Sequence, residues 1–259
     1  MVYDDHIGRG RVLKIAIGIM ALVLMMAGGA GATKFIRNDA TGGDCTSFGT
    51  WNAATKTCTM TADLIETIQI DSNGTTLDGN GYQTTGAGYS SGYGVNLTGR
   101  SGVTIKNLNV AQYYNGFYLL NSNDNYLIGN KASGNVYVGI YLSGSSNNRL
   151  SSNNANSNFD NGIYLDHSNN NALSGNTANS NLGHDGIILY SSDNNTLSGN
   201  TANSNPYRGI ELDYSKINNL TGNIANSNKN FDGIYLFSSS SNTLSGNTAN
   251  SNNGNGIYL

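Results

Sequence analysis

Three acidic residues in the second half of the sequence have the type and spacing for acid–base chemistry on a sugar. Glu211 and Asp213 are two residues apart, and Asp166 stands at the same place in an earlier copy of a repeated segment. If the copies stack as parallel strands, Asp166 and Asp213 lie about 10 Å apart. Glycosidases use two carboxyl groups separated by about 5–9.5 Å. We therefore regard Asp166, Glu211 and Asp213 as candidate catalytic residues; the alternative is that they only keep an exposed strand soluble.

Tyrosines in the same repeats have the composition of a sugar-binding surface. They occupy outward positions, where aromatic rings on a flat face can contact pyranose rings. The alternative is that tyrosine simply favours strands and stacks on itself. The candidate substrate-binding residues are Tyr118, Tyr141, Tyr164, Tyr190, Tyr235 and Tyr258, with His184 and Arg208 on the loops that enter neighbouring repeats.

A repeat that starts at a glycine positions these residues. Gly162-Ile-Tyr-Leu recurs as Gly186-Ile-Ile-Leu, Gly209-Ile-Glu-Leu and Gly233-Ile-Tyr-Leu, and related copies start at positions 94, 116, 139 and 256. The steps between these glycines are 22 to 24 residues, and a fixed period between roughly 20 and 50 residues is typical of a solenoid. We interpret the glycine as the residue that lets the chain turn tightly into the strand.

Within each repeat the apolar residues fall at fixed places counted from the glycine. Positions 1 and 3 are mostly Ile and Leu, position 11 is Leu and position 16 is Ala, which predicts three short strands with inward side chains. Asn stands at positions 9, 14 and 19. Stacked Asn amides can hydrogen-bond along the axis, and Asn also tolerates the left-handed conformation of tight turns. A leucine-rich repeat is the alternative with this period, but Asn-Thr-Ala-Asn-Ser-Asn is a poor helix.

We therefore predict an all-β protein, a right-handed single-stranded parallel β-helix with about 23 residues per coil, about eight coils and a small N-terminal β cap. A charged fraction of 11% with much Asn, Ser and Gly is also found in disordered chains, but such chains need no strict apolar spacing. The last copy stops at Gly256-Ile-Tyr-Leu without a cap. We expect either a truncated reading frame or end-to-end self-association through that open coil.

The N-terminal third has a different organisation. Residues 1–32 combine a basic start, an apolar run and the small residues Ala30-Gly31-Ala32, which predicts a cleaved signal peptide; an uncleaved anchor is the alternative. Residues 33–60 hold Cys45 and Cys58, which we expect to form a disulfide in a β-hairpin cap; a metal bound by two thiols is the alternative. The repeats then occupy residues 61–259.

The repeated Gly-Ile-x-Leu and Ser-x-Asn-Asn-x-Leu-x-Gly-Asn segments resemble the parallel β-helix repeats of NosD-like and related carbohydrate-associated proteins over roughly residues 60–259. The resemblance implies a pectate-lyase-like fold in an exported or surface protein. Its members include glycosidase relatives and a periplasmic protein linked to copper-site assembly. The cysteine-tied cap is also similar to archaeal envelope proteins.

The residues limit what this chain can be expected to bind. A net charge of −3 does not favour nucleic acid or a membrane surface. Copper sites use Met, Cys or His, and beyond residue 32 the chain has Met60, two histidines and the two paired cysteines, so we expect no copper and no other cofactor. Ca²⁺ among the three acids is a weaker alternative, since it needs six to eight oxygens. We expect a secreted or cell-envelope module that binds a polysaccharide or serves a structural role; the alternative is a polysaccharide lyase or glycosidase.

Overall fold

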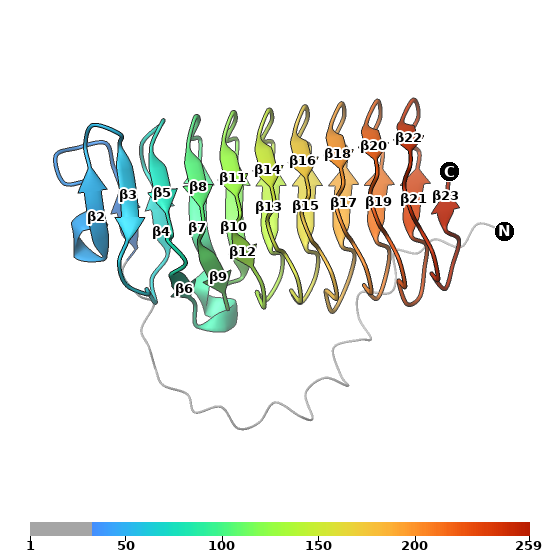
Figure 1. Cartoon of the computed structure of the whole chain (residues 1–259), viewed down its shortest axis with the longest axis horizontal. Coiled ribbons are helices and arrows are strands. Elements are labelled where there is room, and N and C mark those ends of the chain that lie inside the picture. The colour runs from blue at the N-terminus through green and yellow to red at the C-terminus, as the bar shows by residue number, and fades with distance from the viewer. Residues whose placement is uncertain (1–32) are drawn as a thin grey trace, which may run out of the picture.

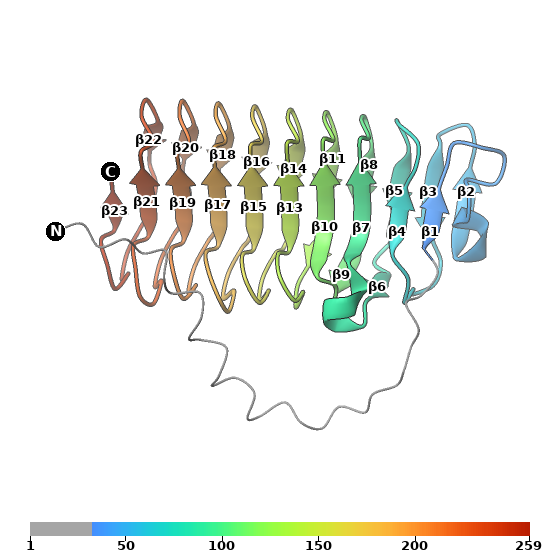
Figure 2. The ribbon, with the colours of Figure 1, turned by 180° about the vertical axis from the view of Figure 1, so that it is seen from behind.

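Three β-sheets of mainly parallel strands wind into one elongated solenoid in the computed structural model, which describes residues 33–259 (Figure 1). Seen from behind, the strands of the first sheet run side by side along the whole axis (Figure 2). The predicted signal peptide, residues 1–32, lies outside the described residues. Among the described residues no helix is long and apolar enough to span a membrane.

Each coil contributes one short strand to each of two long sheets, and a third sheet closes the section. Sheet A holds β1 (Lys34–Ile36), β4 (Ile68–Ile70), β7 (Tyr93–Thr98), β10 (Asn115–Leu120), β13 (Ile140–Ser143), β15 (Ile163–Asp166), β17 (Ile187–Tyr190), β19 (Ile210–Asp213), β21 (Ile234–Phe237) and β23 (Ile257–Tyr258). Sheet B holds β2 (Gly49–Asn52), β3 (Thr57–Met60), β5 (Thr76–Asp78), β8 (Thr104–Lys106), β11 (Tyr126–Ile128), β14 (Arg149–Ser151), β16 (Ala172–Ser174), β18 (Thr196–Ser198), β20 (Asn219–Thr221) and β22 (Thr243–Ser245). Sheet C holds β6 (Gln83–Thr85), β9 (Asn109–Ala111) and β12 (Lys131–Ala132), and single parallel bridges continue it to Thr248.

The predicted all-β parallel solenoid is confirmed, and it has more coils than the glycines indicate. Sheet A has ten strands, because β1 and β4 precede the first counted glycine. β1 lies within the residues expected to form the cap, and it pairs in parallel with β4. The expected hairpin is also present, as β2 and β3 pair antiparallel before β3 joins β5 in parallel. Two short 3-10 helices, η4 (Cys45–Ser47) and η5 (Gly88–Ser91), complete the described elements.

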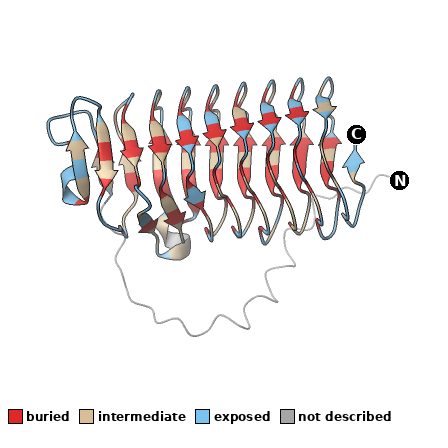
Figure 3. Ribbon diagram, in the orientation of Figure 1, coloured by how far each residue is buried: buried red, intermediate tan, exposed pale blue. Residues whose placement is uncertain are grey.

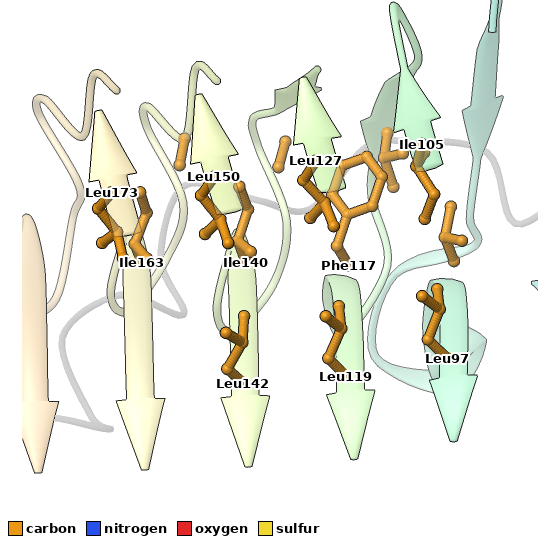
Figure 4. Packing of buried hydrophobic residues seen from close by; sticks show 14 of the residues in the cluster. Leu97, Ile105, Phe117, Leu119, Leu127, Ile140, Leu142, Leu150, Ile163 and Leu173 are labelled. Carbon is orange, nitrogen blue, oxygen red and sulfur yellow. The ribbon is translucent and has the colours of Figure 1, made fainter. Parts of the chain in front are cut away.

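The core is a set of apolar columns along the inside of the coils. Figure 3 shows buried residues recurring at the same places in successive strands, and Figure 4 shows Leu127, Leu150 and Leu173 aligned beside Ile140 and Ile163. All five side chains are fully buried. Burying one such side chain contributes about 1.5–3 kcal/mol, so the inward pattern predicted from positions 1, 3 and 11 is the main stabilising feature.

The buried asparagines form amide ladders, as the sequence predicts, and the ladder that contains Asn153 is continuous from Asn130 to Asn247. Asn153 Nδ2 donates to Asn176 Oδ1 at 3.0 Å and to the carbonyl oxygen of Leu127 at 2.9 Å, while its backbone N–H also donates to Asn176 Oδ1. The ladder residues themselves do not have a positive φ. The left-handed corner residue is the one before, such as Ser152 at φ 55° or Gly175 at φ 62°. The prediction that the ladder asparagines adopt the left-handed conformation is therefore wrong, because hydrogen bonding alone selects them.

The repeat glycine is also selected for a different reason than expected. Gly186 does not have a positive φ, so it provides no special turn. A Cβ placed on it would lie 2.7 Å from Ala202 Cβ and 2.7 Å from Asn205 Nδ2. Glycine and alanine therefore face each other across the coil, and the missing glycine side chain permits this close approach of the chain.

The expected disulfide ties the N-terminal segment together. Cys45 and Cys58 are bonded, with Cα atoms 5.8 Å apart, and both are fully buried. Trp51 donates its ring N–H to the carbonyl oxygen of Asp39 at 3.0 Å and packs against Gly42. At the other end Leu259 is 80% exposed. The predicted end-to-end association through this coil stays a prediction.

Candidate functional site

The candidate residues other than His184 and Arg208 lie in two columns on the outward face of sheet A. The strand register aligns Tyr118, Tyr141 and Tyr164 in one column, which continues through Ile188 and Glu211 to Tyr235 and Tyr258. The second column is two residues further along each strand. It aligns Ser143, Asp166, Tyr190, Asp213 and Phe237. The columns read from the sequence are therefore present in the structure.

The tyrosine rings in the first column stack on one another. The centroids of Tyr141 and Tyr164 are 5.0 Å apart at an interplanar angle of 16°, and Tyr235 and Tyr258 are stacked at 5.0 Å. Tyr118 is tilted against Tyr141 at 5.6 Å. Because each ring covers the face of the next, the column presents ring edges and hydroxyl groups outward. It does not present the free ring faces that sugar stacking requires.

Asp166 does not join the other two acids. Its Oδ2 accepts a hydrogen bond from the Tyr141 hydroxyl at 3.3 Å, and its Oδ1 lies 2.5 Å from His167 Nδ1. Tyr190 stands between Asp166 and Asp213 in the column. Burial and the Asp166 charge raise the pKa of the Tyr141 hydroxyl to about 12.

Glu211 is buried, although it points outward from its strand. It is 9% exposed, because residues from the loop before its own strand and from the previous coil cover it. Arg208 Nη1 donates to Glu211 Oε1 at 3.0 Å, and the guanidinium also lies 3.9 Å from the centroid of the Tyr235 ring. Asp185, which is fully buried, accepts the backbone N–H of Arg208 at 2.7 Å. The expectation that Glu211 lies on an exposed face is therefore wrong.

The charges in this cluster change the acidity of its members. Burial, followed by the nearby Asp185 carboxylate, raises the pKa of Glu211 to about 9, against the opposing effect of Arg208. Burial also raises the pKa of Asp213. The neighbouring Asp185 carboxylate raises the pKa of His184 against the opposing effect of burial, and His184 Nδ1 lies 3.6 Å from Asp185 Oδ2. The arrangement can hold a neutral, proton-donating Glu211 beside Asp213 at neutral pH.

A second aromatic ladder, which the sequence reasoning missed, runs along the edge of sheet A. It consists of the residues two places before each repeat glycine, and we call it the edge ladder. His184 and Tyr207 are stacked at 4.5 Å, Tyr207 and Phe231 at 4.8 Å, and Tyr114 and Tyr137 at 5.0 Å. Counting back from the glycines instead of forward would have found this column.

The other candidates occupy different surroundings. Arg208 is engaged by Glu211 and by the rings of Phe231 and Tyr235. Tyr190 makes an edge contact with Tyr214. Within residues 33–259 no three His, Cys, Asp or Glu side chains are grouped so that they could hold a metal ion.

Two family models match the sequence. The model of the right-handed β-helix region covers residues 49–206, and the model described as periplasmic copper-binding protein (NosD) covers residues 179–259. The right-handed, NosD-like β-helix predicted from the repeats is thereby confirmed. No curated protein sequence matches the chain.

Solved structures with a similar fold include polysaccharide-active proteins. The periplasmic alginate epimerase AlgG has a TM-score of 0.55 and 18% identity, over 74% of this chain and 46% of that one. Tailspike protein 2 of an Escherichia coli O157:H7 bacteriophage has a TM-score of 0.55 and 17% identity, over 70% and 29%. The catalytic domain of an α-1,3-glucanase in complex with tetrasaccharides has a TM-score of 0.50 and 15% identity, over 74% and 45%. The chain thus spans less than half the length of each, and the likeness shows the fold alone.

Proposed function

The chain belongs to the right-handed β-helix family, and from that premise we propose that it binds an extended polysaccharide along the outward face of sheet A. The bound chain would run parallel to the solenoid axis. Its hydroxyl groups would then meet side chains that recur once per coil, at intervals of about 4.8 Å.

The observation that carries this proposal is the one-sided distribution of aromatic residues. In residues 131–259 every aromatic side chain lies in a strand of sheet A or in the turns at its two ends, namely Tyr137, Tyr141, Phe159, Tyr164, Tyr190, Tyr207, Tyr214, Phe231, Tyr235, Phe237 and Tyr258. The outward residues of sheet B in the same coils are mostly Ser and Thr. In a protein that served only as a stalk, no function would require aromatic residues on the sheet A face and small polar residues on the sheet B face.

The chemistry of the sheet A face suits a polyhydroxylated ligand. Stacked tyrosines present hydroxyl groups in a row, and Asp166 and Asp213 add carboxylate acceptors in the next column. Charged and aromatic groups that fix the orientation of a ligand are typical of binding sites. The similar solved structures support the same ligand class, since they include an alginate epimerase and an α-1,3-glucanase in complex with tetrasaccharides.

We further propose that the protein is exported. The basic and apolar features of residues 1–32 suit a signal peptide, and the disulfide suits an oxidising compartment. The descriptions of the NosD family and of the alginate epimerase both name the periplasm. Location at the cell surface or in the medium is a finer prediction, which fractionation of cells that express the full chain would test.

Affinity electrophoresis in gels that contain one polysaccharide each tests binding. Replacing Tyr141, Tyr164 and Tyr235 together by Ala should weaken retention by about tenfold or more. The matched control is Tyr126→Ala, because Tyr126 is an exposed tyrosine on sheet B. Equal retention of the triple variant and the wild type, with folding intact by circular dichroism, would rule out the tyrosine column as the binding surface.

Hydrolysis is a second candidate function, and the raised pKa of Glu211 favours it. A pKa of about 9 keeps Glu211 protonated at neutral pH, which suits the general acid of a glycosidase better than the base of a lyase. Asp213 on the same strand would activate water or act as the nucleophile. Reducing-end release from neutral polysaccharides, lost in Glu211→Gln and in Asp213→Asn, is the expected result. Absence of product from a broad panel would remove this candidate and leave binding intact.

A further inference from the structure

The turn that joins β19 to β20 carries two large side chains, Tyr214 and Ile217, where other coils carry glycine or polar residues (Figure 1). Counted from the repeat glycine, the residues that correspond to Tyr214 are Asn121, Gly144, His167, Ser191 and Ser238. Those that correspond to Ile217 are Asp124, Asn147, Asn170, Asn194 and Ser241. Both exceptions occur in the coil that also holds Glu211 and Asp213.

Both residues adopt a backbone conformation that does not suit their side chains. The angle φ is 48° at Tyr214 and 59° at Ile217. Asn and Asp tolerate this left-handed region, whereas a β-branched or bulky residue there is an outlier. The side chains gain little burial in return, because Ile217 is 61% exposed and Tyr214 is 50% exposed. Strained residues that expose apolar surface are typical of places that contact a ligand.

The ring of Tyr214 is turned out of the face-to-face stacking that covers other tyrosines. Its plane makes an angle of 82° with the ring of Tyr190 and 89° with the ring of Phe237, at centroid distances of 6.1 and 5.7 Å. Phe237 is parallel to Tyr235, whose ring is stacked on Tyr258. Within residues 33–259 no aromatic ring is stacked in parallel on Tyr214. This half-exposed ring therefore offers the free face that the stacked column lacks.

We propose that one hexopyranose unit of the bound polysaccharide stacks on the ring of Tyr214. The inference rests on the proposed polysaccharide binding and names the ring that contacts the sugar. Tyr214 is continuous with the outward face of sheet A, because Tyr190 and Phe237, which contact it on either side, both lie in the second outward column. Ile217 adds a further exposed apolar group in the same turn.

The chemistry of an aromatic ring selects the configuration of the sugar. A pyranose whose hydroxyl groups are all equatorial has C–H bonds on both faces, so either face can pack against the ring of Tyr214. An axial hydroxyl group makes one face polar. Asp213, which precedes Tyr214 and is partly exposed, supplies a carboxylate that can accept hydrogen bonds from equatorial hydroxyl groups. We therefore expect glucose units of a β-glucan to bind better than mannose units.

The residues found in other coils provide the variants that test Tyr214. Tyr214→Asn matches Asn121, suits the left-handed φ and removes the ring. In gels that contain hydroxyethyl cellulose, a soluble β-glucan, this variant should lose retention by about tenfold or more. Tyr214→Phe keeps the ring and should be retained like the wild type. The matched control is Ser191→Asn, at the corresponding position of the previous coil, and it should leave retention unchanged.

Ile217→Asn gives a second measurement, in which stability and binding should change in opposite directions. Asn is the residue at this position in three earlier coils. Relief of the left-handed strain should raise the midpoint of thermal unfolding by about 2–4 °C, while loss of the apolar group should weaken retention about threefold. A residue with only a structural role would not weaken binding while its replacement stabilises the fold.

The outcomes separate the role of Tyr214 from the general proposal. If the wild type is retained and folded Tyr214→Asn is retained equally, the stacking on Tyr214 is wrong and the sheet A surface stands. If mannan or alginate retains the wild type and β-glucan does not, the assignment to an equatorial sugar is wrong. A wild-type chain that no polysaccharide retains overturns both proposals.

Two further results also decide the question. If gel filtration shows a wild-type dimer that Tyr214→Asn converts to a monomer, Tyr214 contacts a second copy of the chain and the proposed stacking is wrong. Should Tyr214→Asn fail to fold, Tyr214→Ser takes its place, since Ser191 and Ser238 hold the same position in the neighbouring coils. Retention of that variant equal to the wild type would overturn the proposal in the same way.

Discussion

Arg208 donates a 3.0 Å hydrogen bond to Glu211, yet the pKa of Glu211 is raised to about 9. A cation at that distance normally favours the charged form of a carboxyl group. Here burial and the carboxylate of Asp185 outweigh it, because both penalise a second negative charge in the same enclosed space. Glu211 is therefore protonated at neutral pH.

The retained proton predicts how stability depends on pH. Glu211 keeps its proton in the folded state up to about pH 9, whereas the unfolded chain loses it near 4.5. Between these values the folded state binds more protons, so its stability falls as pH rises, by about 1.4 kcal/mol per pH unit for one full proton. Glu211→Gln removes this contribution. Urea unfolding from pH 5 to 9.5 should show the stability of the wild type declining relative to the variant, and parallel curves would show that Glu211 ionises normally.

The amide ladders predict a large cost for one buried asparagine. In Asn176→Ala the amide that donates to the carbonyl oxygen of Leu150 and to Asn200 Oδ1 is lost, and the backbone N–H of Asn153 loses its acceptor. Each buried group left unpaired costs about 1–3 kcal/mol. We expect a loss of more than about 2 kcal/mol in chemical unfolding. Asn250→Ala, at an exposed position, should stay within about 0.5 kcal/mol, and an equally small effect for Asn176 would contradict the ladder as a stabilising feature.

The close approach at the repeat glycine predicts that even one methyl group is not tolerated there. Gly186→Ala would bring Cβ within 2.7 Å of Ala202 Cβ, and we expect it to cost about 1–3 kcal/mol through overpacking. Gly199→Ser is the matched control, since Gly199 has a positive φ in open space and Ser152 takes the same place two coils earlier. Thermal unfolding should therefore separate the two variants. A larger loss for Gly199→Ser would mean that turn conformation, not packing, dominates.

The disulfide predicts a redox-dependent stability. Cys45 and Cys58 are 13 residues apart, and closing a loop of that size stabilises by about 3 kcal/mol in the chain-entropy model. Unfolding with and without a reductant, or in the Cys45→Ser and Cys58→Ser double variant, should show this loss first in the N-terminal coils. Identical unfolding curves in both conditions would mean that the hairpin holds without its crosslink.

Much of the fold follows from local spacing in the sequence. The apolar columns, the Asn ladders and the outward columns of sheet A all depend on a period of 22 to 24 residues and on alternation along a strand. Identical residues at identical places in parallel coils must align, so the register needed no further information. The strand Lys34–Ile36, which forms the first coil, was assigned to the cap because it carries no repeat glycine.

The environment of the site was decided only by the tertiary structure. Alternation correctly placed Glu211 outward, but it could not show that Arg208 donates to it and that burial beside Asp185 of the previous coil raises its pKa. Stacking likewise turned the faces of neighbouring tyrosine rings, such as those of Tyr141 and Tyr164, toward one another. The spacing of residues along one strand determines which way each side chain points. Its burial and its coupling to other charges depend on side chains that lie about one coil away in the sequence.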